Sequence, residues 1–247
     1  MVRSALMLLI FWFSACNSSE QQRGATTAPP PEVRVVGAMR NVMWKGELGG
    51  SINLDTLADR SDLYGLGPVA FLSGEIMVSG GRAYVSRVAS DSTIRVERTF
   101  AVEAPFFVYA RVSDWTEQPL PDDVVDLKHL EAFVDQQTKD QVRPFAFKLS
   151  GRVAEADIHV QNLPPGTEVS SPTEAHQGQQ SYTLTDSEVE IVGFFSTEHQ
   201  GIFTHHDTFL HTHLVTQDER WMGHLDRVRF VPGAVRLYLP AAGTCRD

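Results

Sequence analysis

Short apolar runs, separated by glycine, proline, aspartate and serine, dominate the chain from residue 33 onward. Runs of this length and spacing are typical of β-strands. Strands are expected in the first half at residues 33–36, 76–78, 83–88, 93–96 and 106–112. In the second half they are expected at 144–149, 152–160, 188–195, 209–215, 228–230 and 235–239. Gly80-Gly81 joins two of these runs, so residues 75–88 are predicted to form an antiparallel hairpin.

One segment has the spacing of a helix. Pro121, Asp122 and Asp123 supply capping residues, and apolar side chains then recur every three or four positions from residue 124 to about 137. The polar stretch 170–180 is expected to be a loop. The predicted fold class is α+β, predominantly β. Two β-sheet-based halves with one main helix are expected to meet near residue 140.

The N-terminal residues indicate export. A basic start, an apolar run over residues 5–13 and small residues before a cysteine are typical of a signal peptide, here residues 1–15. Phe13-Ser14-Ala15-Cys16 resembles a bacterial lipobox, which predicts lipidation of Cys16 and attachment to a membrane through this anchor only. Because Asn17 rather than aspartate follows the cysteine, the outer membrane, facing the periplasm, is the expected location. An ordinary secretory signal with an incidental cysteine is the alternative.

Residues 16–31 are rich in Ser, Gln, Thr and Ala and end in three prolines. They are predicted to be a flexible tether, so that residues 32–247 form the folded domain.

A hydrophobic content of 42% over 247 residues excludes a disordered chain, and only 2 Cys exclude a disulfide scaffold. Lipidation of Cys16 leaves Cys245 without an intramolecular partner. The formal net charge of -10 argues against nucleic acid as a partner.

Six of the nine histidines lie between residues 199 and 224. His211 and His213 are two positions apart in a strand-like run, so both imidazoles are expected on one face. A hairpin through the turn-like residues 217–220 would bring His224 beside them, and three neutral imidazoles suit a Zn²⁺ ion with one position open. Two surface histidines are the ordinary interpretation of His-x-His alone. His205-His206-Asp207 is either a second ligand set or a solvated loop, and no role is assigned to His129, His159 or His176.

A glycine-rich segment, residues 63–78, leads to Glu75 at the start of an apolar strand. A solvated glutamate at a strand end is the default interpretation of this residue. Motifs elsewhere in the chain also bear on the interpretation of Glu75. The segment Leu66-Gly67 to Gly74-Glu75-Ile76, the hairpin that follows and the run 144–151 precede Val192-Gly193-Phe194, His211-x-His213 and Gly223-His224 in that order. With these motifs, the chain from about residue 33 to the 230s resembles the α-acetolactate decarboxylase family.

The resemblance implies two β-rich halves, a Zn²⁺ ion on His211, His213 and His224, and Glu75 as the active-site glutamate. It also implies conversion of 2-acetolactate, or a close 2-hydroxy-3-keto acid, to acetoin and CO₂. The hydroxyl and ketone oxygens of such a substrate can chelate one cation, whose Lewis acidity stabilises the charge left when CO₂ departs. A carboxyl group can then relay the proton that completes acetoin. No organic cofactor is expected, and a homodimer is compatible with the sequence.

Three departures from the family pattern concern the substrate. Lys148 aligns with a family arginine and is expected to position the substrate carboxylate, without the two-pronged contact of a guanidinium. Pro68 replaces a hydroxyl-bearing residue, and the C-terminal extension with a further glutamate is missing. Two alternatives therefore stay open. One is an exported, metal-containing lipoprotein that binds a small hydroxy or keto acid without turnover. The other is a metal-storage or sensing protein that uses the histidine-rich segment.

Overall fold

The computed structural model describes residues 31–241. The predicted signal peptide, Cys16 and the tether up to residue 30 lie outside the described residues, as does Cys245. Within residues 31–241, no helix is both long enough and apolar enough to cross a membrane.

The first sheet is built from the N-terminal part of the chain. Its six strands are antiparallel to their neighbours and lie in the order β1 (Val33–Val36), β8 (Phe107–Arg111), β3 (Leu63–Pro68), β4 (Glu75–Ser79), β5 (Arg82–Ser90) and β6 (Thr93–Arg98). The predicted hairpin is confirmed as β4 and β5. The short strands β2 (Ile52–Asn53) and β7 (Glu103–Ala104) form a separate pair.

The second sheet contains the long strands. They are β9 (Trp115–Pro119), β10 (Phe145–Val160), β11 (Gln180–Phe195), β12 (Leu210–Thr216) and β13 (Met222–Pro240). Strand β10 pairs with both β11 and β13, while β12 pairs with β11 and β13, so these four strands close on themselves. Strand β9 adds to the far end of β13.

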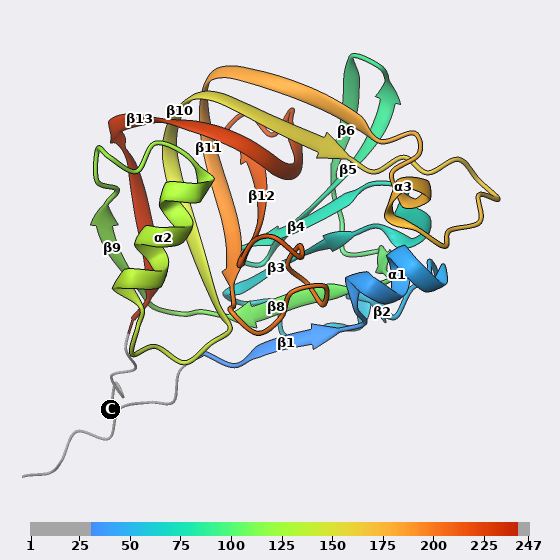
Figure 1. Ribbon diagram of the computed structural model, residues 1–247, viewed down its shortest axis with the longest axis horizontal. Helices are drawn as coiled ribbons and strands as arrows, with labels where there is room; N and C mark the ends of the chain where they lie inside the picture. Colours follow the sequence, from blue (N-terminus) through green and yellow to red (C-terminus); the bar gives the residue numbers. More distant parts are fainter. Residues whose placement is uncertain (1–30, 242–247) are drawn as a thin grey trace, which may run out of the picture.

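Within residues 31–241, three α-helices accompany the sheets: α1 (Met39–Lys45), α2 (Leu127–Gln137) and α3 (Pro172–Ala175). Two short 3₁₀ helices, η1 (Leu54–Thr56) and η2 (Ala70–Leu72), lie in the first half. The main helix, α2, confirms the predicted one. The carboxylate of Asp126 caps it by accepting a hydrogen bond from the backbone N–H of His129, and Leu130 and Val134 are buried against the second sheet. Helix α2 packs against the second sheet, whereas α1 and α3 lie together at the other end of the molecule (Figure 1).

The two sheets share one hydrophobic core. Leu66 and Met77 of the first sheet pack with Val192, Phe194 and Met222 of the second. The predominantly β fold class is thus confirmed. This packing also determines where chemistry can occur, because polar residues at the sheet–sheet interface are removed from water and face each other.

Several element boundaries differ from the prediction. Residues 144–149 and 152–160 belong to one strand, β10, and 228–230 and 235–239 belong to β13. In β10 the pairing with β11 continues without a break from Phe145 to Val153. In β13, residues 231–234 form an irregularity between two stretches that pair with β10. Helices α1 and α3 and strands β3 and β9 were not predicted, and β11 begins at Gln180 instead of residue 188. The chain also leaves the first sheet after Arg111, ahead of the expected meeting point near residue 140.

Candidate metal centre

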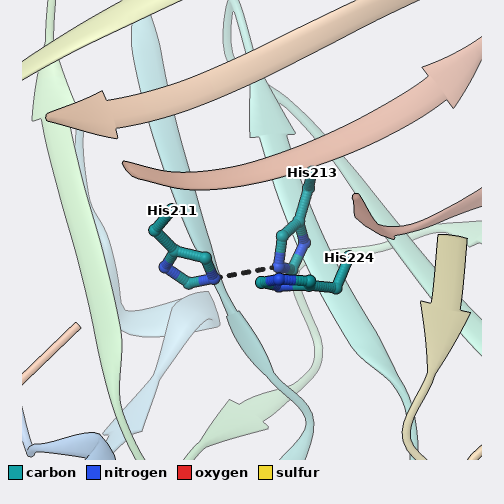
Figure 2. A group of neighbouring side chains, drawn as sticks. All are labelled: His211, His213 and His224. Carbon is teal, nitrogen blue, oxygen red and sulfur yellow. Dashed lines mark hydrogen bonds between the residues drawn. The ribbon is translucent and has the colours of Figure 1, made fainter. Parts of the chain in front are cut away.

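Three histidine rings converge between the sheets, and the strand register explains why. His211 and His213 are two residues apart on β12 and project from the same face. On β13, His224 is the direct cross-strand partner of His213. Opposed residues of antiparallel strands bring their side chains close together. The three imidazoles therefore point toward one another (Figure 2).

The ring nitrogens are close enough to share one ion. Nε2 of His211 and Nε2 of His213 are 3.2 Å apart. The ligand atoms of all three histidines lie within 4.8 Å of one another. His211, His213 and His224 are 2%, 0% and 9% exposed, so their rings have little contact with bulk solvent. Nδ1 of His211 has no hydrogen-bond partner among the described residues. The structure thus contains a buried histidine triad that could hold a metal ion.

Burial also fixes the charge state of the triad. Desolvation, with the neighbouring His159 adding to it, lowers the pKa of the His213 imidazole to about 3. Desolvation also holds the pKa of His211 and His224 well below the ordinary histidine value, with further contributions from the surrounding histidines. The rings are therefore neutral at physiological pH, which is the form that donates a lone pair to a metal.

Glu75 reaches the triad from the first sheet. It begins β4, is 3% exposed, and places Oε2 3.7 Å from Nε2 of His213. Its Oε1 accepts a hydrogen bond of 3.4 Å from the backbone N–H of Gln161, which follows β10. Burial raises the pKa of the Glu75 carboxyl group well above its ordinary value, against the effect of that hydrogen bond. The protonated, proton-donating form is consequently favoured.

Two glycines allow the strands that carry Glu75 and His224 to lie close to their neighbouring strands. A Cβ atom on Gly74 would lie 2.2 Å from the carbonyl oxygen of Ser86, so a side chain there would push β4 away from β5 next to Glu75. A Cβ atom on Gly223 would lie 2.6 Å from the carbonyl oxygen of His159. Glycine at 223 therefore lets β13 approach β10 just before His224.

A small cavity of about 30 Å³ opens at the triad. It is lined by Met39, Met43, Pro68, Leu72, Glu75, Phe106, His159, Gln161, His176, His205, His211 and His224. None of these residues is Lys or Arg. A larger cavity of about 500 Å³ between α2 and strands β12 and β13 shares His205 and His224 with it. His205 and the triad residue His224 thus border both cavities.

The structure brings four of the five predicted active-site residues together: His211, His213, His224 and Glu75. It does not bring Lys148 to them. The Lys148 side chain lies on β10 with Nζ 4.6 Å from the ring centre of Tyr238 and 5.6 Å from that of Trp115. The expected contact of Lys148 with a substrate carboxylate therefore has no support in the geometry.

Two residues of the site were missed in the sequence. His159 on β10 is the cross-strand partner of His224 on the side opposite His213, and its ring stacks on His224 with centroids 4.6 Å apart. Nδ1 of His159 is 2.8 Å from Oδ1 of Asp226. The i, i+2 spacing of His224 and Asp226 could have suggested one shared face. Nothing in the sequence showed that β10 pairs with β13.

A family comparison matches this site and this fold. The model of the alpha-acetolactate decarboxylase family matches residues 36–240, which includes Glu75 and the whole triad. The chain belongs to the alpha-acetolactate decarboxylase family. No curated protein sequence matches the chain.

Solved structures of this family have the same fold. Alpha-acetolactate decarboxylase from Bacillus subtilis strain 168 superposes with a TM-score of 0.69 at 18% sequence identity, over 84% of this chain and 83% of that chain. A Staphylococcus aureus protein of unknown function, similar to alpha-acetolactate decarboxylase, gives a TM-score of 0.69 at 17% identity. That match covers 83% of this chain and 84% of the other. At these identities the likeness concerns the fold.

Proposed function

We propose that this protein is a zinc-dependent decarboxylase that converts 2-acetolactate, or a close 2-hydroxy-3-keto acid, to acetoin and CO₂. The observation that carries the proposal is the convergence of three buried imidazoles with a buried glutamate inside a fold of this family. Structural metal sites have a closed ligand set, whereas three histidines leave a position for a small molecule.

The residues present fit a divalent metal. His211, His213 and His224 would hold it, since their ring nitrogens lie within 4.8 Å of one another and burial keeps the rings neutral. A three-imidazole set is typical of zinc. When bound, such an ion supplies Lewis acidity toward the hydroxyl and ketone oxygens of the substrate, which lowers the energy of the electron-rich product of CO₂ loss.

Glu75 completes the reaction in this proposal. Breaking the bond between C1 and C2 of acetolactate releases CO₂ and leaves the electron pair on C2, conjugated with the ketone. One proton must then be added at C2 to give acetoin. The carboxyl group of Glu75 is 3.7 Å from Nε2 of His213 and lines the same cavity, so it is placed to supply that proton and recover it from solvent.

The apolar wall of the cavity suits the reaction. The cavity adjoins the triad and is walled by Leu72, Phe106 and the two methionines of α1, so a substrate group that enters displaces water from the reacting carbon. Because the cavity of about 30 Å³ holds only one or two water-sized groups, the rest of the substrate would occupy the larger cavity that also borders His224.

The test is acetoin formation from racemic acetolactate by the purified protein, before and after chelator treatment and again after addition of zinc. We expect activity that the chelator abolishes and zinc restores. The variant His129→Ala, which changes an exposed histidine on α2, should behave as the wild type does. No acetoin from a folded, zinc-loaded protein would overturn the proposal.

Binding without turnover is the second candidate. It is favoured by Pro68, which lines the cavity where the family pattern has a hydroxyl group, and by the lack of a Lys or Arg side chain among the lining residues. In that case the zinc-loaded protein would bind acetolactate saturably, and calorimetry would record binding while no acetoin appeared.

A further inference from the structure

Gln161 carries a buried amide group that the proposed reaction leaves without a role. It follows β10, is 4% exposed and lines the small cavity together with Glu75, His211 and His224. Its side-chain Oε1 is buried and has no hydrogen-bond partner among residues 31–241. An unpaired acceptor in a buried site costs free energy, so a ligand that brings a donor to it gains affinity.

The other end of the amide is held by a neighbouring side chain. Val160 pairs with Gln180 at the end of the ladder between β10 and β11, so Gln161 and Gln179 come next and lie opposite each other. Nε2 of Gln161 donates a hydrogen bond of 3.2 Å to Oε1 of Gln179, which does not line the cavity. This contact orients the amide and leaves Oε1 as the end that is free for a ligand.

The backbone of Gln161 connects the residue to the site. Its N–H group donates to Oε1 of Glu75, and Oε2 of the same carboxyl group is 3.7 Å from Nε2 of His213. Gln161 therefore adjoins the proposed proton donor directly. Because a side-chain replacement keeps the backbone N–H, the amide can be removed without removing the contact with Glu75.

The size of the cavity indicates which ligand group the amide can meet. A cavity of about 30 Å³ holds one or two water-sized groups. A hydroxyl group has this size and can donate to Oε1, whereas a ketone or carboxylate oxygen only accepts. If the two ends of the amide exchanged places, a hydroxyl group could still pair with it, because it both donates and accepts.

We propose that Gln161, oriented by Gln179, accepts a hydrogen bond from the hydroxyl group of a 2-hydroxy acid at the triad and so determines specificity for hydroxylated ligands. The inference rests on the proposed function for the place of the ligand, but it concerns recognition and not turnover. A ligand of the same shape without the hydroxyl group leaves the amide oxygen unpaired, which costs affinity.

The test compares two inert probes on the zinc-loaded protein by isothermal titration calorimetry. The probes are 2-hydroxy-2-methylpropanoate and 2-methylpropanoate, which differ by one hydroxyl group. Since the metal also favours a hydroxyl group, the quantity that reports on Gln161 is the change in preference between wild type and variant. Gln161→Met keeps the length and burial of the side chain without the amide, and it should lower the preference by about five- to tenfold.

Two further variants separate recognition from structure. Gln161→Asn keeps the amide but withdraws it by one methylene group, so it should also lower the preference, and it decides the question if Gln161→Met fails to fold. Gln136→Met changes an exposed glutamine of α2 and should keep the wild-type preference. The zinc content of both Gln161 variants should match that of the wild type.

Four results would overturn the inference. They are an unchanged preference in the Gln161 variants, an equal loss of affinity for both probes, a loss of zinc from these variants, and no binding of the hydroxylated probe to the zinc-loaded wild type. Equal weakening of both probes would show that Gln161 only packs against the site. Failure of the proposed function is distinguishable, because a protein that forms no acetoin can still show the change in preference and an active one can lack it.

Discussion

At the scale of single residues, burial determines what each site histidine can do. His211, His213 and His224 have neutral rings because desolvation lowers the pKa of each imidazole, whereas His129 on α2 stays exposed. The same burial acts in the opposite direction on Glu75 and raises the pKa of its carboxyl group. One environment thus yields neutral metal ligands and a proton donor side by side.

Replacing His213 by Asn should remove the metal. The His213 ring is fully buried, its Nε2 lies 3.2 Å from Nε2 of His211, and the residue pairs with His224, so its loss leaves two of the three converging imidazoles. We expect zinc affinity to fall by more than about 100-fold, measured by competition with a chromogenic chelator. Unchanged zinc affinity in this variant, compared with His129→Asn as the control, would exclude the triad as the metal site.

Replacing Glu75 by Gln should separate metal binding from chemistry. The amide keeps the size and the hydrogen bond from Gln161 but cannot deliver a proton. We expect zinc content to be unchanged and kcat for acetoin formation to fall by about 10²- to 10⁴-fold. A fully active variant would show that Glu75 is not the proton donor.

At the scale of elements, the site depends on how closely β13 approaches its neighbours. His224 is paired with His213 on β12 and with His159 on β10, so a shift of β13 moves three imidazoles relative to one another. Gly223 permits the close contact with the carbonyl group of His159. The histidine spacing alone would not be enough without this glycine.

Gly223→Ala should therefore disturb both stability and metal binding. The added methyl group would lie 2.6 Å from a backbone oxygen, which cannot swing aside as a side chain can. We expect a loss of about 1–3 kcal/mol in the free energy of unfolding, together with weaker zinc binding. Chemical denaturation measures the first. Gly49→Ala, where a Cβ atom meets nothing within 4 Å, is the matched control and should differ little from the wild type.

At the scale of the whole molecule, the buried triad links stability to pH. In the metal-free protein, the unfolded chain binds protons at these histidines near their ordinary pKa of 6.5, and the folded chain binds them only at lower pH. The unfolded state thus holds more protons below that value, so stability falls as pH falls. The raised pKa of Glu75 has the opposite effect, because it increases stability as pH falls, but it involves one group against three histidines.

We expect the free energy of unfolding of the chelator-treated protein to decrease from pH 6.5 downward, by up to about 1.4 kcal/mol per pH unit for each histidine. Urea denaturation at a series of pH values measures this slope. The His213→Asn variant should have a smaller slope, because one fewer proton is taken up on unfolding. A stability that is flat between pH 7 and pH 5 would contradict the buried, neutral triad.

The proposed lipidation of Cys16 also concerns the whole molecule, since it would determine where the protein works. Lipidation at this residue would place the protein outside the cytoplasm on the outer membrane. We expect the wild-type protein to incorporate radiolabelled palmitate and to sediment with outer membranes, and Cys16→Ser to lose both properties. A labelled Cys16→Ser variant would show that the cysteine is not the site.

The sequence by itself determined the β-rich class, the hairpin at β4 and β5, the main helix, and the residues Glu75, His211, His213 and His224. The elements and the three histidines follow from local rules, because strand alternation places His211 and His213 on one face and a short turn returns His224 beside them. The role of Glu75 came only from the resemblance to the family. Lys148 was predicted as a substrate-binding residue from its alignment with a family arginine. Its position on β10 instead places its side chain next to Tyr238 and Trp115.

Only the tertiary structure determined which residues surround Glu75 and the histidine triad. Pairing of β10 with β13 joins positions 65 residues apart, as in His159 and His224, and packing of the sheets brings Glu75 to His213. Such contacts depend on register, on a bulge at Asp226 and on a glycine at 223, none of which leaves a periodic signal in the chain. Long-range pairing is fixed by the sum of many packing contacts, so it emerges only when the whole domain is folded.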